Sequence, residues 1–306
     1  ATPGYKPCVL TPGEWQIIVG AYKIAPEGVE VKYEIDIAKK YQRLYKGDLH
    51  VHTLASDGIY TVEELKERAQ RLGLDFIAIT DHNQMVSALE LPKARDFSVI
   101  PGVEYTHFKG HANFLGVAEP YKEPYPANTF DEVKLRFQSA YESGATVVIN
   151  HPFQEPAAFQ FDMPALPYHC LEVWNGPMRD SNLKAIELWQ KLLMEGKRVP
   201  ICGGSDFHRD DIPFIFLGGP TTCVYALSLS ICDILTALRE GNAFISFAPS
   251  GPILQMQAGD AMMGDQVAWK GGKELTIEAD NLMKGDVLQL ITAYEKETLL
   301  AAPQNG

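Results

Sequence analysis

The stretch that decides the fold is GDLHVHT, at residues 47–53. It has the length and alternation of a β-strand, in which residues two apart point to the same face. We therefore expect His50 and His52 to point the same way, so that one strand offers two imidazoles to a single metal ion. Asp57 follows in the turn ASDG, directly before a predicted helix.

Short apolar runs alternate with amphipathic helices beyond this stretch. Two helices begin with a capping box, Thr61 with Glu64 and Thr129 with Glu132. Two more are predicted at residues 181–196 and 230–241. Strands are predicted at residues 47–52, 76–80, 99–103, 113–117, 146–150, 170–174 and 199–203. This alternation is typical of βα units and predicts an α/β barrel.

The two flanks of the chain have β character. The first contains β-like runs at residues 15–19 and 29–35, and the last contains others at 275–279 and 287–291. We therefore predict three sections, namely an N-terminal β segment (1–46), the barrel (47–247) and a C-terminal β-rich domain (248–306). The two β sections are expected to pack together as a small accessory domain.

Composition and charge narrow the class of protein. The chain has 306 residues, of which 46% are hydrophobic, enough for a sizeable core. Its net charge is 27 − 39 = −12, and an acidic surface does not favour a nucleic-acid polymer as partner. No apolar stretch reaches the ~18–20 residues of a membrane-spanning helix.

The cysteines point to a reducing compartment. Their number is odd and none forms a C-x-x-C pair, which predicts free thiols and a cytoplasmic location. They are Cys8, Cys170, Cys202, Cys223 and Cys232. The chain begins at Ala1 rather than at methionine, so the sequence is also compatible with a leader that has been removed.

Six of the eight histidines and three carboxylates lie at or just after predicted strands. They are His50, His52, Asp57, His82, Glu104, His111, His151, Asp206 and His208. In a parallel barrel the loops after the strands meet at one rim, so these side chains are expected to converge. They are too many for one ion and suit two or three zinc, manganese or iron ions. A set so rich in nitrogen disfavours calcium.

The alternative interpretation is that each histidine is an ordinary surface or structural residue. That holds for most single histidines after a strand, but six histidines and three carboxylates in series favour a metal centre. We expect a supporting or surface role for His107, and His169 has no partner motif. Asp81 either orients His82 or caps the following turn.

The ordered motifs resemble those of the PHP family, named after polymerase and histidinol phosphatase. They are GDLHVHT (47–53), SDG (56–58), TDH (80–82), GVE (102–104), NHP (150–152) and SDFH (205–208). The resemblance covers residues 47–247 and implies a distorted (β/α)7 barrel with a two- or three-metal site. The run LEVWN (171–175) resembles a family segment that lines the site. The flanking β sections resemble a branch that contains a carbaryl hydrolase.

The resemblance also implies how the ligands divide among the ions. His50, His52, Glu104 and Asp206 would hold one ion, and Glu104, His111 and His151 a second. Asp57, His82 and His208 would hold a third, although some family members have histidine at the Asp57 position. Glu104 would thus bridge two ions.

These inferences predict a metal-dependent hydrolase. A bound metal lowers the pKa of its water and so provides a hydroxide nucleophile, which we expect near Glu104. Asp206 or His208 would relay a proton to the leaving group. Asn175, Arg179 and Arg209 are candidate substrate-binding residues, because arginine binds phosphate well.

The expected substrate is a small phosphorylated metabolite or nucleotide. Two alternatives stay open, one being hydrolysis of a carbamate or carboxyl ester by the same cluster. The other is a non-catalytic binding protein that uses its flanking β sections. The complete ligand set argues against a protein without catalytic activity.

Overall fold

A computed structural model describes residues 11–18, 20, 23–33, 39–85, 91–92, 94–268, 271 and 274–302. The chain divides into two units, Ala1–Lys40 and Tyr41–Gly306. In the first unit, residues 15–18 and 29–33 are exposed and form no strand, so the β-strands predicted there are wrong in their described parts. A β-prone run becomes a strand only when a partner accepts its backbone hydrogen bonds. The rest of these two runs, and Cys8, lie outside the described residues.

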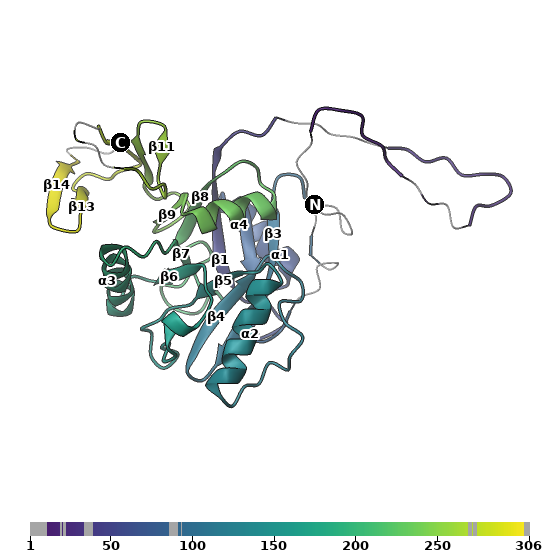
Figure 1. The fold of residues 1–306 in the computed structure, drawn as a ribbon, viewed down its shortest axis with the longest axis horizontal. Coiled ribbons are helices and arrows are strands. Elements are labelled where there is room, and N and C mark those ends of the chain that lie inside the picture. Colours follow the sequence, from purple (N-terminus) through teal and green to yellow (C-terminus); the bar gives the residue numbers. More distant parts are fainter. Residues whose placement is uncertain are drawn as a thin grey trace. The chain divides into compact units, whose positions relative to one another are not determined.

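The second unit is built on a nine-stranded sheet (Figure 1). Its strands, in sheet order, are β7 (Ile201–Gly204), β6 (Cys170–Asn175), β5 (Thr146–Ile149), β4 (Gly110–Leu115), β3 (Ser98–His107), β2 (Phe76–Ile79), β1 (Arg43–Val51), β8 (Thr221–Ala226) and β9 (Ala243–Ser246). The seven predicted strands all form, while β8 and β9 were not predicted from the sequence. The α/β class and the distorted barrel are confirmed.

The sheet departs from a regular repeat of βα units. β1, β2 and β3 are parallel, as are β5, β6 and β7, but β4 is antiparallel to both β3 and β5. The hairpin between β3 and β4 explains this difference. Only a tight turn joins His107 to Gly110, whereas a parallel crossover needs a dozen or more residues.

Backbone hydrogen bonds next to β7 close the barrel onto β1. The amide of Asp206 donates to the carbonyl of His50 at 2.9 Å, and the amide of His52 donates to the carbonyl of Phe207 at 3.0 Å. The loop after β7 thus continues the sheet along the end of β1. Two of the sequence-predicted ligand motifs, far apart in the chain, become direct neighbours.

The described part of the chain has four helices, which pack against the sheet, and all four were predicted. They are α1 (Val62–Arg71), α2 (Phe130–Glu142), α3 (Asp180–Met194) and α4 (Ile231–Glu240). The capping boxes at Thr61 and Thr129 both form, which fixes where α1 and α2 begin. A 3₁₀ turn, η1 (Met163–Ala165), lies between β5 and β6. Apolar side chains of the helices pack on the strands, as Phe137 of α2 does beside Phe114 of β4.

The C-terminal section is β-rich, as expected. β10 (Ile253–Ala258), β11 (Ala261–Met262) and β12 (Thr276–Asp280) form a three-stranded sheet. β13 (Val287–Ile291) and β14 (Lys296–Ala301) form a hairpin. The packing of residues 1–46 on this section stays a prediction. In the described part of the chain, no helix is long and apolar enough to cross a membrane.

Candidate metal centre

Strand β1 carries the first two histidines into the barrel. Side chains alternate along it, so Leu49 and Val51 pack into the apolar core while His50 and His52 point inward. Both imidazoles are fully buried, and their ring centroids lie 5.2 Å apart. The strand therefore presents two imidazoles on one face, as its sequence predicted.

Glu104, near the end of β3, lies at the centre of the cluster. Its Oε1 atom is 3.1 Å from His111 Nδ1, 3.3 Å from His50 Nε2 and 3.3 Å from His151 Nε2. Its Oε2 atom is 2.7 Å from His82 Nδ1 and 3.6 Å from His52 Nε2. One carboxylate with both oxygens among five imidazoles is suited to bridging two ions.

Asp206 approaches the cluster from the loop after β7. Its Oδ1 atom is 3.1 Å from His52 Nε2 and 3.5 Å from His50 Nε2. The backbone of Asp206 has a φ of 55°, and that of His151 has a φ of 26°. Such angles are costly for residues other than glycine and collect at functional sites.

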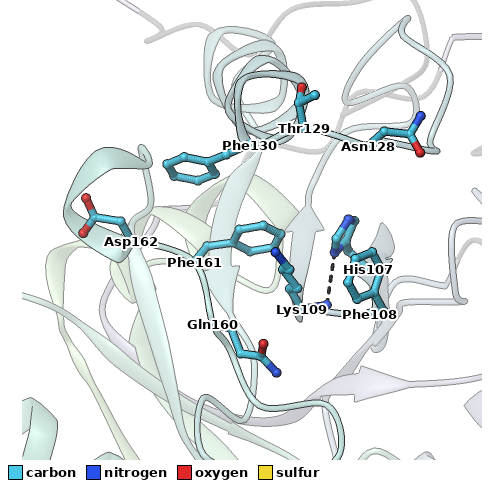
Figure 2. Close-up of a pocket in the computed structure, with 9 residues that line it drawn as sticks. All are labelled: His107, Phe108, Lys109, Asn128, Thr129, Phe130, Gln160, Phe161 and Asp162. Atoms are coloured by element: carbon cyan, nitrogen blue, oxygen red, sulfur yellow. Dashed lines mark hydrogen bonds between the residues drawn. The ribbon is translucent and has the colours of Figure 1, made fainter.

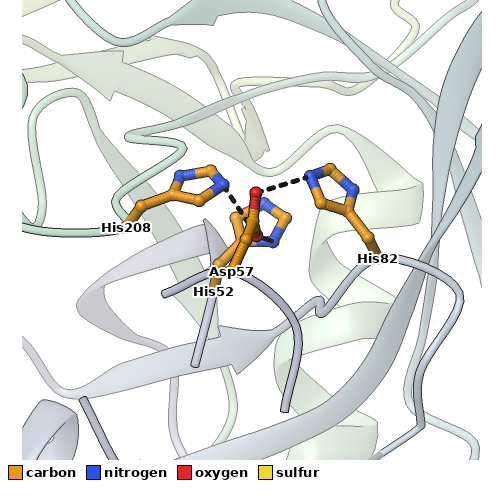
Figure 3. Close-up of side chains that lie close together, drawn as sticks. All are labelled: His52, Asp57, His82 and His208. Carbon is orange, nitrogen blue, oxygen red and sulfur yellow. Dashed lines mark ion pairs between the residues drawn. The ribbon is translucent and has the colours of Figure 1, made fainter. Parts of the chain in front are cut away.

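Asp57 and His208 form the outer side of the cluster together with His82 and His52 (Figure 3). Asp57 Oδ1 is 3.2 Å from His208 Nε2, and Asp57 Oδ2 is 3.7 Å from His82 Nε2. The Asp57 side chain is 56% exposed, whereas Glu104 is 1% exposed. The cluster is thus buried at Glu104 and open to solvent at Asp57, which is the side a substrate can reach.

All nine residues predicted as ligands come together, although their donor atoms group differently from the division that the family resemblance implies. Donor atoms within 4.8 Å of one another form four sets: His52, Asp57, His82 and His208; His50, Glu104 and His151; His50, His52 and Asp206; and His82, Glu104 and His111. His52 thus also approaches the outer set, and His82 also approaches Glu104. The role of each residue as a ligand stays a prediction.

The donor chemistry fits transition-metal ions. His50 Nε2 and both ring nitrogens of His52 are buried, and although carboxylate oxygens lie 3.1–3.8 Å away, none of the three makes a hydrogen bond of good geometry to any described residue. A buried polar atom without a partner costs roughly 1–3 kcal/mol, so several at one point need an explanation. A cation coordinated by these nitrogens would provide the missing partner, and nitrogen-rich sets suit zinc, manganese or iron.

The electrostatics of the cluster also favour cations. Burial raises the pKa of Glu104, but His50 and the other imidazoles outweigh it and hold this pKa well below its usual range. Burial lowers the pKa of His50, but Glu172 and other carboxylates outweigh it and hold this pKa well above its usual range. The His50 imidazole and the Glu104 carboxylate thus each favour the charged form of the other. Metal ions would compete with protons for such nitrogens, because a ligand imidazole must be neutral.

Glu172 on β6 supports the cluster, a role that sequence reasoning did not assign. Its Oε1 atom is 2.9 Å from His50 Nδ1, so His50 directs Nε2 at Glu104. Its Oε2 atom accepts a hydrogen bond from the backbone amide of His151 at 3.0 Å. The signal in the sequence was a single charged residue inside an apolar strand. A carboxylate that fixes a ligand imidazole in this way tunes metal affinity.

Two further polar residues position the ligands. Thr106 Oγ1 lies 2.7 Å from His82 Nδ1, and the Asn150 amide donates to Glu104 Oε1 at 2.9 Å. Asp81 accepts hydrogen bonds from Thr53 and Ser56, so it holds the loop after β1. These side-chain hydrogen bonds go to the loop after β1, so they correspond neither to orienting His82 nor to capping the turn after Asp81.

The three candidate substrate-binding residues lie in different surroundings. Asn175 is buried, and its amide donates to Glu172 Oε2 at 3.2 Å, which is a supporting contact. Arg179 precedes α3 and is partly buried, with Nε donating to the carbonyl of Pro177 at 3.3 Å. Arg209 follows His208 and is 49% exposed, with Nε 3.5 Å from Asp211. Contact between any of them and substrate stays a prediction.

A family model matches the part of the chain that holds most of the cluster, and curated relatives match shorter stretches of the chain. Residues 48–145 match the PHP domain, and six of the nine predicted ligands lie within this stretch. The chain is 42% identical over 65 residues to the 5'-3' exoribonuclease Rnm of Salmonella typhimurium, covering 19% of this chain and 21% of that protein. It is 35% identical over 81 residues to the phosphoribosyl 1,2-cyclic phosphate 1,2-diphosphodiesterase of Eggerthella lenta, covering 24% of this chain and 31% of that protein. The chain therefore spans less than a third of the length of either relative.

A solved structure extends the likeness to nearly the whole chain. It is a two-domain protein from Bacteroides vulgatus containing a predicted PHP-like metal-dependent phosphoesterase. The TM-score is 0.54 at 20% identity, covering 90% of this chain and 89% of that one. At this identity the likeness concerns the fold. Together with the PHP match, it confirms the predicted resemblance and the fold, while the hydrolase activity and the carbaryl-hydrolase branch stay predictions.

Proposed function

We propose that this protein is a metal-dependent phosphoesterase that acts on a small phosphorylated metabolite or a nucleotide. The observation that carries the proposal is the convergence of six imidazoles and three carboxylates, buried at Glu104 and open at Asp57. The buried nitrogens that lack a hydrogen bond to any described residue favour bound cations over a purely structural polar network.

The cluster would hold two or three divalent ions of the zinc, manganese or iron type. When bound, such ions supply a water of lowered pKa as nucleophile and stabilise negative charge on the reacting phosphate. Glu104 would keep the ions close together, since both of its oxygens face imidazoles. Glu172 would keep the His50 ring in one orientation throughout the reaction.

The outer residues would handle protons and substrate. With only two ions, held by the sets that contain Glu104, His208 Nε2 would stay uncoordinated, 3.2 Å from the exposed carboxylate of Asp57, and would be in place to exchange a proton at the open side of the cluster. Asp206 lies two residues before His208 in the chain and is the second candidate for proton transfer. The guanidinium groups of Arg179 and Arg209 would bind the phosphate from the loops after β6 and β7.

The relatives support a phosphoester without fixing its size. One matched relative is named for a small cyclic phosphate and another for RNA. The net charge of −12 favours the small substrate, because an acidic surface repels a polyanion. The cytoplasmic location is part of the proposal, supported by the free cysteines among the described residues.

A substrate panel tests the proposal. The protein, loaded with manganese or zinc, is assayed against phosphomonoesters, phosphodiesters, aryl esters and carbamates. We expect phosphate chemistry that is lost in His50→Ala and in Asp206→Ala. The control is His169→Gln, because His169 lies outside the cluster and stacks on Tyr141.

Ester or carbamate cleavage without any phosphoester cleavage would replace the proposed reaction by the alternative hydrolase. Metal binding without cleavage of any compound would favour the non-catalytic alternative. Full activity in both alanine variants would show that the cluster is not the catalytic centre.

A further inference from the structure

The outer donor set of the metal centre consists of His52, Asp57, His82 and His208 (Figure 3). Asp57 and His208 lie in loops beyond the ends of β1 and β7, whereas Glu104 and His111 of the other sets lie on strands. Metal ligands must be held in place by the residues around them. For Asp57 and His208 the sheet does not do this, so contacts between the loops have to.

Backbone hydrogen bonds join the two loops side by side. The amide of Ile59 donates to the carbonyl of His208 at 3.1 Å. The amide of Leu54 donates to the carbonyl of Tyr60 at 2.9 Å, which closes the turn that contains Asp57. The position of Asp57 relative to His208 therefore depends on how these loops lie against each other.

Three side chains connect both loops to helix α1, and we call them the loop clamp. They are Tyr60, Arg68 and Asp210. Arg68 Nη1 donates to Asp210 Oδ1 at 3.0 Å, and Arg68 Nη2 donates to the Tyr60 hydroxyl at 2.7 Å. That hydroxyl in turn donates to Asp210 Oδ2, and the Arg68 guanidinium carbon lies 3.9 Å from the centroid of the Tyr60 ring. Asp210 lies two residues after His208, so the clamp holds the His208 loop to α1.

The loop clamp is placed to fix the loops more than to stabilise the whole fold. The Arg68 side chain is 33% exposed and that of Asp210 is 56% exposed. Ion pairs so exposed contribute little to stability, because water screens them. The planar fork of an arginine with a fixed partner on each arm nevertheless restricts where those partners can lie.

The β3–β4 hairpin, which carries His111, is supported separately. On the face opposite His111, the ring of His107 lies 4.3 Å from that of Phe108 and 5.0 Å from that of Phe161, measured between centroids. These rings line a pocket of about 240 Å³ (Figure 2). His107 Nε2 also lies 3.1 Å from the carbonyl oxygen of Ala127. A change in the loop clamp should therefore leave His111 in place.

We infer that the loop clamp positions Asp57 and His208 so that the outer donor set retains a metal ion. The inference rests on the proposed metal-dependent function and assigns positioning residues to the exposed side of the same centre. The clamp acts through the two loops and takes no part in the chemical step. Without it the loops can separate, and the outer ion is held more weakly than the ions at Glu104.

Titration of the metal-free protein with zinc, in competition with a chromophoric chelator, measures the affinity of each ion. Asp57→Ala identifies the outer ion, because Asp57 belongs to the outer set alone. Arg68→Met removes the centre of the clamp, and Tyr60→Phe removes only its hydroxyl. Arg71→Met is the matched control, because Arg71 is also on α1 but pairs with Glu67 at 3.9 Å.

Arg68→Met should weaken binding of the outer ion about tenfold or more, as for other residues that orient a metal ligand. The affinity of the remaining ions should not change. Arg68→Lys should lie between Arg68→Met and wild type, because lysine keeps the charge but loses the fork. Tyr60→Phe should weaken the same ion, and Arg71→Met should bind every ion as wild type does.

Wild-type protein that binds no more ions than Asp57→Ala would overturn the inference. So would equal weakening of all ions in Arg68→Met and Tyr60→Phe, which indicates a general effect on the fold. If phosphoesters are cleaved and the outer ion binds wild type and both clamp variants alike, the inference fails and the proposed function stands. An outer ion that depends on the clamp, in a protein that cleaves no phosphoester, would support the inference and reject the proposed function.

Discussion

Replacing Glu172 by glutamine tests whether this carboxylate orients the ligand His50 and the backbone of His151. Glu172 is 2% exposed and accepts three hydrogen bonds, from His50 Nδ1 on one oxygen, and from the His151 amide and Asn175 on the other. Glutamine has one acceptor oxygen and one NH₂ donor in place of these two acceptors. In either orientation of the amide, at least one N–H group therefore meets another donor.

The magnitude follows from these contacts. Loss of a carboxylate that orients a ligand histidine typically costs 10–100-fold in metal affinity. The metal-free protein should lose roughly 1–3 kcal/mol of stability through the buried donor left without an acceptor. A competition titration with a chromophoric zinc chelator measures the affinity, and urea unfolding in the presence of a strong chelator measures the stability.

Glu142→Gln is the matched control, because Glu142 is exposed at the end of α2 and outside the cluster. It should leave metal affinity unchanged. Metal affinity in Glu172→Gln equal to that of wild type would refute the assigned orientation of His50. If stability falls while metal affinity stays unchanged, Glu172 supports the fold and not the metal ligands.

Three other changes test separate parts of the structure. Thr61→Ala removes the capping box of α1 and should cost about 1 kcal/mol in urea unfolding with unchanged metal affinity; a loss of metal binding would contradict this. Gly204→Ala would place a Cβ 2.3 Å from His50 Cβ. The resulting overpacking should lower the free energy of unfolding by about 1–3 kcal/mol and weaken metal binding. A variant as stable as wild type would show that the strand shifts freely. Burial, and then Arg239, lowers the pKa of His169 to about 4 from 6.5. The folded state thus binds fewer protons than the unfolded state between these values, and stability falls as pH drops from 6.5 to about 4. His169→Gln should lose less stability over that range in urea titrations, and an identical pH dependence would contradict the assignment.

The sequence predicted the helices well because their signals are local. The capping boxes at Thr61 and Thr129 fix the first turn through contacts three residues apart, and both form. The strand GDLHVHT was predictable for the same reason, because alternation decides which side chains share a face. The convergence of most ligands followed from a topological rule, that loops after parallel strands meet at one rim. His111 is the exception, because it begins the antiparallel strand β4 and reaches the rim through the β3–β4 hairpin.

Features that depend on contacts distant in sequence were not predictable in the same way. The β3–β4 hairpin reverses β4, and the pairing of residues 206–207 with the end of β1 closes the barrel. Register and closure then decide which donor atoms meet, so His52 approaches the outer set as well as Asp206. Glu172 supports His50 from 122 positions away, and no local pattern specifies that pairing.

The β-like runs in residues 11–33 show that a local sequence signal can also mislead. Their composition favours strands, but the described residues there form none. β-propensity reflects a fit to a pleated and half-buried surface more than an intrinsic preference of the backbone. A run without a paired neighbour therefore does not become a strand on propensity alone.

Metal content per chain is the most direct measurement of the central claim. Elemental analysis of the protein, after incubation with zinc or manganese and removal of excess metal, should find two or three ions per chain. The double variant His50→Ala, Asp206→Ala should hold fewer, because both residues have donor atoms in the buried sets. A protein that retains no transition-metal ion under any of these conditions would contradict the account, as would a double variant that holds as many ions as wild type.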